Sequence, residues 1–246
     1  MKRVLTVLVL LPPIVWVVLA GPRWAFLALL ALVGLAAFYE FNAIARIPSG
    51  IPGMVAGLVF LLAPEPAYLT LVILTLVLMT LSLSDLSMTS CAVSLLGIVY
   101  IFGAWRSADA LRTLNPHWLM IALLVSWAGD TAALYIGRAF GRHKLAPRVS
   151  PQKTWEGAAG SLLGGVLAAG LYAHYLIPNA PLKLVLPIAA AANIAGQIGD
   201  LCESAFKRGA NVKDSGTTLP GHGGWLDRID ATLFSVPVVY ALLSVL

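Results

Sequence analysis

Charge is what this chain has least of. Only 11% of its 246 residues are Asp, Glu, Lys or Arg, against about a quarter in ordinary soluble domains. Hydrophobic residues make up 59% of the chain, and its mean hydropathy is +0.88. This composition excludes an ordinary water-soluble globular protein and indicates an integral membrane protein. Acidic residues are rarest in the first 117 positions, which contain only Glu40, Glu65, Asp85 and Asp109.

Cysteine is also rare. The two cysteines, Cys91 and Cys202, lie in separate apolar runs and have no spacing typical of a metal site or a redox motif. A disulfide is therefore not expected.

Long apolar runs are abundant. A helix needs about 20 apolar residues to cross about 30 Å of hydrocarbon. The sequence predicts an all-α polytopic membrane protein with about nine transmembrane helices, at roughly 4–20, 24–44, 51–64, 67–84, 90–105, 118–137, 157–177, 183–203 and 230–246. The first run follows Lys2 and Arg3 as a signal peptide would, but Pro12, Pro13 and the lack of a small-residue cleavage site favour a retained span.

The positions of Lys and Arg predict the topology. They cluster in two segments that are separated by two predicted spans, one from Arg138 to Lys153 and one from Lys207 to Arg228. Because Lys and Arg concentrate in cytoplasmic loops, we expect loops 138–156 and 204–229 to be cytoplasmic, with the N-terminus inside and the C-terminus outside. Residues 1–117 read as a transmembrane scaffold and residues 118–246 as the functional region.

Carboxylates mark that second region. On a helix, Asp200, Glu203 and Lys207 share one face with Ser204. Asp227 and Asp230 form a second i, i+3 pair at the start of the last span. Magnesium prefers such oxygen ligands and uses one or two protein carboxylates while phosphates supply others. The alternative reading is an ion-pair network that only joins two helices.

A glycine-rich segment lies between these carboxylate pairs. It reads SGTTLPGHGG, residues 215–224, and has neither the Walker A pattern nor a dinucleotide-binding pattern. Glycines let the backbone approach an anion closely and turn its N–H groups toward it. The residues alone therefore predict metal-assisted chemistry on a phosphate at the cytoplasmic face of a membrane.

Two longer segments carry a family resemblance. They are SAFKRGANVKDSGTTLPGHGGWLDRID and, upstream, GDTAALYIGRAFGRHKLAPRVSPQKTWEG. Together they resemble the phosphatidate cytidylyltransferase (CDP-diacylglycerol synthase) family, over about residues 126 to 230. The resemblance implies transfer of CMP from CTP to phosphatidic acid, giving CDP-diacylglycerol and pyrophosphate in phospholipid biosynthesis. It also implies Mg²⁺, with a second cation left open, a homodimer in the bacterial inner membrane, and no nucleic-acid partner.

The resemblance assigns roles to individual residues of this chain. The residues expected to be catalytic are Asp200, Asp227, Lys207 and Arg228, and those expected to hold metal are Asp200, Asp227, Glu203 and Asp230. The residues expected to bind substrate are Lys153, Ser204, Arg208, Lys213, His222, Gly223 and Gly224.

Two other functions stay open on the sequence. A transporter or channel would also place carboxylates in a membrane protein, but would spread them through the depth of several spans. A CTP-dependent lipid kinase would use similar residues and transfer the γ-phosphate instead. The products of the reaction distinguish these possibilities.

Overall fold

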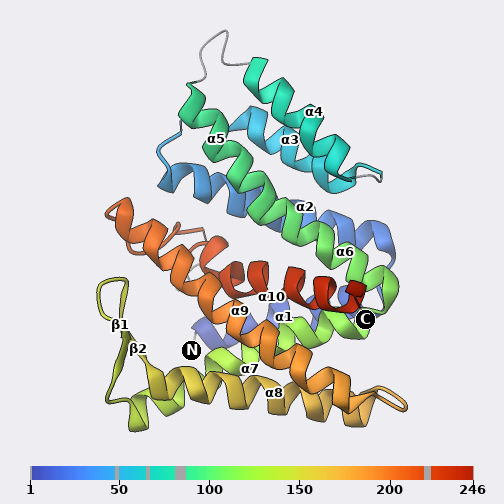
Figure 1. Cartoon of the computed structure of the whole chain (residues 1–246), viewed down its shortest axis with the longest axis vertical. Coiled ribbons are helices and arrows are strands. Elements are labelled where there is room, and N and C mark those ends of the chain that lie inside the picture. Colours follow the sequence, from blue (N-terminus) through green and yellow to red (C-terminus); the bar gives the residue numbers. More distant parts are fainter. Residues whose placement is uncertain (1, 48–49, 65–66, 81–86, 219–222, 246) are drawn as a thin grey trace.

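The chain is helical almost throughout (Figure 1). The computed structural model describes residues 2–47, 50–64, 67–80, 87–218 and 223–245, with only the backbone described for residues 2–10. The first half contains α1 (Lys2–Leu19), α2 (Arg23–Ile44), α3 (Ile51–Leu62), α4 (Ala67–Thr80), α5 (Met88–Gly97), the π-helix η2 (Ile98–Gly103) and α6 (Ala104–Leu114). The second half contains α7 (Pro116–Phe140), β1 (Lys144–Ala146), β2 (Ser150–Thr154), α8 (Trp155–Leu176), α9 (Leu182–Gly209) and α10 (Leu226–Val245).

Six helices among the described residues are long and apolar enough to cross a membrane. They are α2, the continuous helix formed by α5, η2 and α6, and then α7, α8, α9 and α10. The predicted all-helical membrane architecture is confirmed. The prediction of about nine spans is not, because α3 and α4 have only 12 and 14 residues.

The functional half is built on a close pair of helices, α7 and α8. Glycines on α8 let the two backbones approach: a Cβ at Gly164 would lie 2.5 Å from the Cβ of Ala132, and one at Gly160 would lie 2.6 Å from Ile136. Small residues at helix contacts are typical of membrane proteins, since packing rather than hydrophobicity drives association there. The pair supports α9, which packs against both helices.

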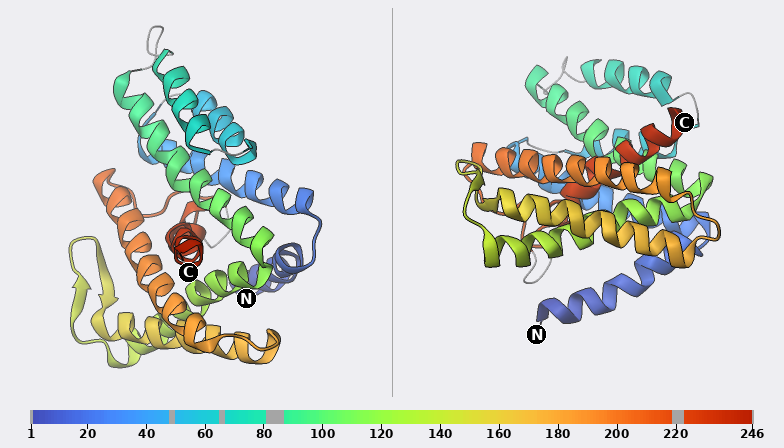
Figure 2. Two further views of the ribbon diagram at one scale, coloured as in Figure 1. Left: turned by 45° about the vertical axis from the view of Figure 1, so that its right-hand side comes forward. Right: turned by 60° about the horizontal axis from the view of Figure 1, so that its bottom comes forward.

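Helix α10 occupies the centre of the molecule. It contacts α9 and α7 on one side and α6 and α2 on the other, and Figure 2 (left) looks nearly along it. One contiguous apolar core joins the two halves, and it includes Phe38 and Phe102, whose ring centroids are 5.7 Å apart.

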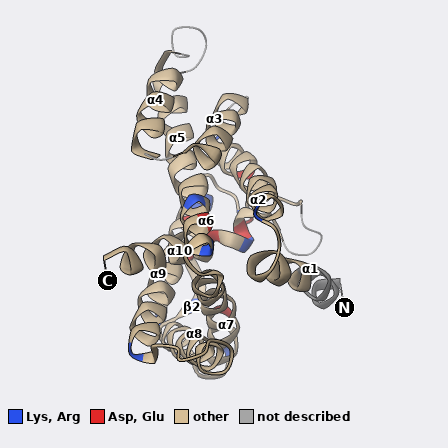
Figure 3. Cartoon of the chain, turned by 90° about the vertical axis from the view of Figure 1, so that its right-hand side faces the viewer, with Lys and Arg blue, Asp and Glu red and all other residues tan. Residues whose placement is uncertain are grey.

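The ribbon carries few charged residues (Figure 3). The expected division into scaffold and functional region stays a prediction.

The two basic segments meet at one end of the molecule. The end of α7, the β1–β2 hairpin, the start of α8, the end of α9 and the start of α10 all lie there (Figure 1, left). The all-helical prediction missed the hairpin, since strands of three and five residues are too short to show a clear period of two.

The predicted loop 204–229 is also too long. Helix α9 continues to Gly209 and α10 begins at Leu226. The predicted boundaries followed hydrophobicity, whereas backbone hydrogen bonds extend both helices through their charged residues.

Candidate active site

The polar face predicted for α9 is present. Asp200, Glu203, Ser204 and Lys207 lie on the same helix, and Ser204 Oγ donates to Asp200 Oδ1 over 3.4 Å. Glu203 has 0% of its side chain exposed and Lys207 has 10%. A carboxylate and an ammonium buried this deeply need partners, because desolvation of an unpaired charge is costly.

Lys207 supplies that pairing and connects α9 to α10. Its Nζ forms an ion pair with Glu203 and donates to Asp227 Oδ1 over 2.6 Å. Asp227 is in the first turn of α10 and has 6% of its side chain exposed. Apart from Lys207, no described donor reaches either carboxylate oxygen of Glu203. The Lys207 ammonium therefore pairs with two buried carboxylates, Glu203 on α9 and Asp227 on α10.

Asp227 also organises the glycine-rich loop. Its Oδ2 accepts the backbone N–H groups of Ser215 over 3.0 Å and Gly224 over 2.9 Å. Gly223 has a φ of +80°, and a Cβ there would lie 2.7 Å from Asp227 Oδ2. Glycine adopts this backbone conformation without strain, so the loop can close on the carboxylate.

The hairpin brings a second lysine to the same face. Lys153 of β2 forms a 2.5 Å ion pair with Asp200, and both side chains are about 30% exposed. Arg208 Nε donates to the carbonyl of Val149, in the hairpin turn, over 3.3 Å. The hairpin and the end of α9 are therefore in contact, while the expectation that both segments are cytoplasmic stays a prediction.

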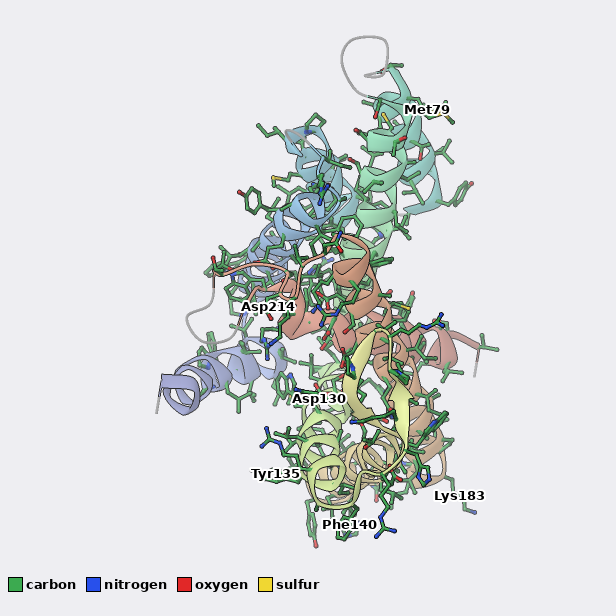
Figure 4. The ribbon with its side chains drawn as sticks, turned by 90° about the vertical axis from the view of Figure 1, so that its left-hand side faces the viewer. Met79, Asp130, Tyr135, Phe140, Lys183 and Asp214 are labelled. Carbon is green, nitrogen blue, oxygen red and sulfur yellow. The ribbon has the colours of Figure 1, made fainter. Side chains whose placement is uncertain are left out.

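The remaining expected site residues are less constrained. Lys213 and Arg228 are exposed, Asp230 is half-buried, and Ala231 donates its N–H to Asp230 Oδ1 over 2.7 Å. Asp230 is within reach of the charges of Asp200, Glu203 and Asp130. Figure 4 looks at this end of the molecule and shows Asp130 and Asp214 near its middle and Met79 at its margin. His222 lies outside the described residues.

The donor set of this end fits a hard divalent cation. Carboxylates from α7, α9 and α10 lie within electrostatic range of one another: Asp130, Asp200, Glu203, Asp227 and Asp230. Among the described residues, no group of three or more His, Cys, Asp or Glu is already arranged around one point. Magnesium needs only one or two protein carboxylates when phosphates and water supply the rest, so the arrangement is compatible with it. Which carboxylates would hold the ion stays a prediction.

Glu40 was not among the residues expected at the site. It lies in α2, in the half read as scaffold, is only 2% exposed, and accepts hydrogen bonds from the glycine-rich loop. One signal could have found it: Glu40 is the only carboxylate in the run from 23 to 44, and ionisable residues within membrane segments are rare and usually functional.

Tyr100 of η2 is a second contribution from the first half. Its hydroxyl is buried with no hydrogen-bond partner among the described residues. The ring packs against Phe41 and Phe234, with centroids 6.2 Å and 5.9 Å away. The charges of Asp230 and Glu203 reach the hydroxyl. π-Helical turns are frequent at functional sites, and this one places a buried hydroxyl within electrostatic range of the carboxylates.

An apolar groove lies on the opposite face of α9. Its volume is about 510 Å³. Ala205, Phe206 and Gly209 line it, and at 100° per residue they lie opposite Asp200 and Lys207 on the helix. The other lining residues are Phe41, Ile44, Ala45, Arg46, Val93, Leu96, Ala210 and Asn211. The groove thus lies on the face of α9 that is opposite the charged side chains.

Comparison with known proteins identifies the family. The chain matches the model of the "Cytidylyltransferase family" over residues 1–246. It is 31% identical over 231 residues to "Phosphatidate cytidylyltransferase" of Staphylococcus aureus, which is 89% of this chain and 88% of that protein. It is 40% identical over 152 residues to the protein of that name from Staphylococcus haemolyticus and 38% identical over 154 residues to that from Bacillus subtilis. These two matches span 58% and 56% of the relatives' lengths. Because the family model covers all of its residues, the chain belongs to the cytidylyltransferase family.

Proposed function

We propose that this chain is a phosphatidate cytidylyltransferase, which transfers CMP from CTP to phosphatidic acid and gives CDP-diacylglycerol and pyrophosphate. One observation carries the proposal most directly. Lys207 lies between two buried carboxylates, one of which binds the N–H groups of Ser215 and Gly224, at the charged end of membrane-length helices. The names of the related staphylococcal and Bacillus proteins support the same reaction.

The reaction needs no side-chain nucleophile. A phosphate oxygen of phosphatidic acid attacks the α-phosphorus of CTP, a new P–O bond forms, and the bond between that phosphorus and the α,β-bridging oxygen breaks, so that pyrophosphate leaves. The protein has to hold two anionic substrates in line and stabilise the charge that develops on the phosphates. Lys153, Arg208, Lys213 and Arg228 are the proposed cations for this task, together with the N–H groups near Gly223 and Gly224.

Magnesium is the proposed cofactor. Bound here, it would neutralise charge on the triphosphate. Asp200, Asp227, Glu203 and Asp230 are the proposed ligands, and a second cation stays open. Asp227 has a further task in the chain itself, because its two oxygens already fix Lys207 and the N–H groups of the loop. Ser204 would keep the Asp200 carboxylate oriented through its hydrogen bond.

The position of the charged end suits a lipid substrate. The acyl chains of phosphatidic acid can stay in the bilayer while the headgroup meets CTP from the aqueous phase. Lysine and arginine near helix ends can extend to the phosphate level of the membrane. We further propose that the enzyme is a homodimer in the bacterial inner membrane, with its site facing the cytoplasm, and that it binds no nucleic acid.

Product analysis tests the proposal. Purified chain in lipid nanodiscs is incubated with magnesium, phosphatidic acid and CTP labelled at the α-phosphate. The label is expected in CDP-diacylglycerol, with one pyrophosphate released for each lipid product. Formation of CDP with unlabelled lipid product would instead identify a lipid kinase. Failure to form either product would reject both enzymes and favour a transporter.

A further inference from the structure

Glu40 makes an unusual long-range connection. Its carboxylate accepts four hydrogen bonds from residues far along the chain. The donors are Ser215 Oγ at 2.8 Å, Thr218 Oγ1 at 2.6 Å, Trp225 N at 3.0 Å and Leu226 N at 2.9 Å. All four lie in the glycine-rich loop or at the start of α10. A helix of the first half thus determines where this loop is held.

Two of these donors belong to the beginning of a helix. The first N–H groups of a helix have no partner within it, and the positive end of the helix dipole favours a carboxylate there. Leu226 is the first residue of α10, and Trp225 precedes it. Glu40 therefore caps α10 from another helix, which fixes both the position and the direction of its first turn.

A continuous chain of hydrogen bonds runs from Glu40 to the charged end. Ser215 Oγ donates to Glu40 and accepts the N–H of Asp227 over 3.3 Å. The N–H of Ser215 donates to Asp227 Oδ2, and Asp227 Oδ1 accepts from Lys207. Glu40 is thus linked through Ser215 to the carboxylate that holds Lys207.

The backbone of the loop closes tightly around Glu40. A Cβ at Gly224 would lie 2.2 Å from Glu40 Oε2, and one at Gly216 would lie 2.7 Å from Oε1. No side chain fits at these distances unless the carboxylate or the loop moves. The glycines at these two positions therefore let the backbone reach a carboxylate supplied by α2.

We propose that Glu40 is a positioning residue of the cytidylyltransferase reaction. It holds the glycine-rich loop and the first turn of α10 so that Asp227 and Lys207 face the substrates. The inference rests on the proposed function. An apolar side chain at this position would leave the N–H groups of Trp225 and Leu226 without their acceptor, which is costly for buried donors. A charged acceptor is needed where several donors of one loop have to be gathered at one point.

Three variants test this inference. Glu40→Gln keeps the size but places an amide NH₂ against the donors, and Ser215→Ala interrupts the link between Glu40 and Asp227. Asp109→Asn is the matched control, because Asp109 is another carboxylate of the first half, paired with Arg23 at 2.8 Å and outside this chain of hydrogen bonds. For each variant, kcat, the KM for CTP and the melting temperature are measured on the folded protein.

We expect Glu40→Gln and Ser215→Ala each to lower kcat/KM by tenfold to a hundredfold, about the loss that a 1 Å displacement of a reacting group can cause. The double variant should be little worse than the worse single variant, because both changes break one pathway. Asp109→Asn should stay within twofold of the wild type. A purely structural role would reduce the yield of folded protein while leaving its kcat and KM unchanged, and that result in both variants would overturn the inference. Should Glu40→Gln not fold, Ser215→Ala decides alone.

A second measurement does not depend on activity. The N–H groups of Trp225 and Leu226 donate to Glu40, so hydrogen–deuterium exchange of the peptide that contains them is followed by mass spectrometry in nanodiscs. Exchange there should be at least fivefold faster in Glu40→Gln than in the wild type, and an unchanged rate would overturn the inference. If the wild type makes no CDP-diacylglycerol while the exchange rates still differ, the proposed function fails and the role of Glu40 in holding the start of α10 stands.

Discussion

Replacing Lys207 with methionine tests the charge balance at the centre of the site. The change keeps a long unbranched side chain and removes the ammonium. Lys207 is 10% exposed and lies between Glu203, which is 0% exposed, and Asp227, which is 6% exposed. Without it, two buried carboxylates lose their shared cation. Removing one partner of a buried ion pair costs about 3–5 kcal/mol, so we expect Lys207→Met to lower the free energy of unfolding by about that amount.

A second substitution shows how much of the lost unfolding free energy comes from each carboxylate. Glu203→Gln in the Lys207→Met background removes one of the two unpaired charges. The double variant should therefore regain about half of the lost stability, while Glu203→Gln alone leaves Lys207 paired with Asp227 and costs less than Lys207→Met. The double variant should not regain turnover, because it still lacks the positive charge of Lys207 that the proposed reaction uses.

Denaturant unfolding in a mild detergent, followed by tryptophan fluorescence, gives the free energies. Lys183→Met is the matched control, since Lys183 is exposed in the first turn of α9, whereas Lys207 is in its last turn. An exposed substitution away from a specific contact should change stability by no more than about 0.5 kcal/mol. If Lys207→Met were as stable as Lys183→Met, the two carboxylates would not depend on Lys207, and the electrostatic reasoning would be refuted.

Two further substitutions probe the loop and the hairpin. Gly224→Ala places a Cβ 2.2 Å from Glu40 Oε2, whereas a Cβ at Gly209 would meet nothing within 4 Å. We therefore expect Gly224→Ala to lower kcat/KM for CTP at least tenfold and the control Gly209→Ala to stay within twofold of the wild type. Equal activities would contradict the close approach of the backbone to Glu40. Lys153→Gln breaks the ion pair with Asp200, in which both side chains are about 30% exposed. It should change the free energy of unfolding by less than about 1 kcal/mol but lower kcat/KM for CTP at least tenfold. Wild-type kinetics would exclude Lys153 from phosphate binding.

Local spacing predicted the part of the site that lies on one helix. The i, i+3 and i+7 positions placed Asp200, Glu203 and Lys207 on one face of α9, because a helix turns by 100° per residue. The apolar runs likewise predicted most helices. Hydrophobic length could not establish the number of spans, since α3 and α4 are apolar but short.

Long-range partners could not be predicted in the same way. Glu40 and Leu226 are separated by 186 residues, and no periodic pattern connects them. The position of Tyr100 beside Asp230 depends on how η2 packs against α10. Both residues lie in the half that contains few charges, so composition directed attention to the other half. A lone carboxylate in an apolar helix was the one local signal available.

The connection from Glu40 also determines the order in which the active end can form during synthesis. Leu226 follows Glu40 by 186 residues, which a ribosome adds in about 10–40 s at 5–20 residues per second. For most of that time α2 carries a carboxylate whose four donors do not yet exist, since the first of them follows Glu40 by 175 residues. The carboxylate of Glu40 must therefore find other hydrogen-bond donors, such as water, until α10 is made, and its native contacts can form only when α10 joins the other helices.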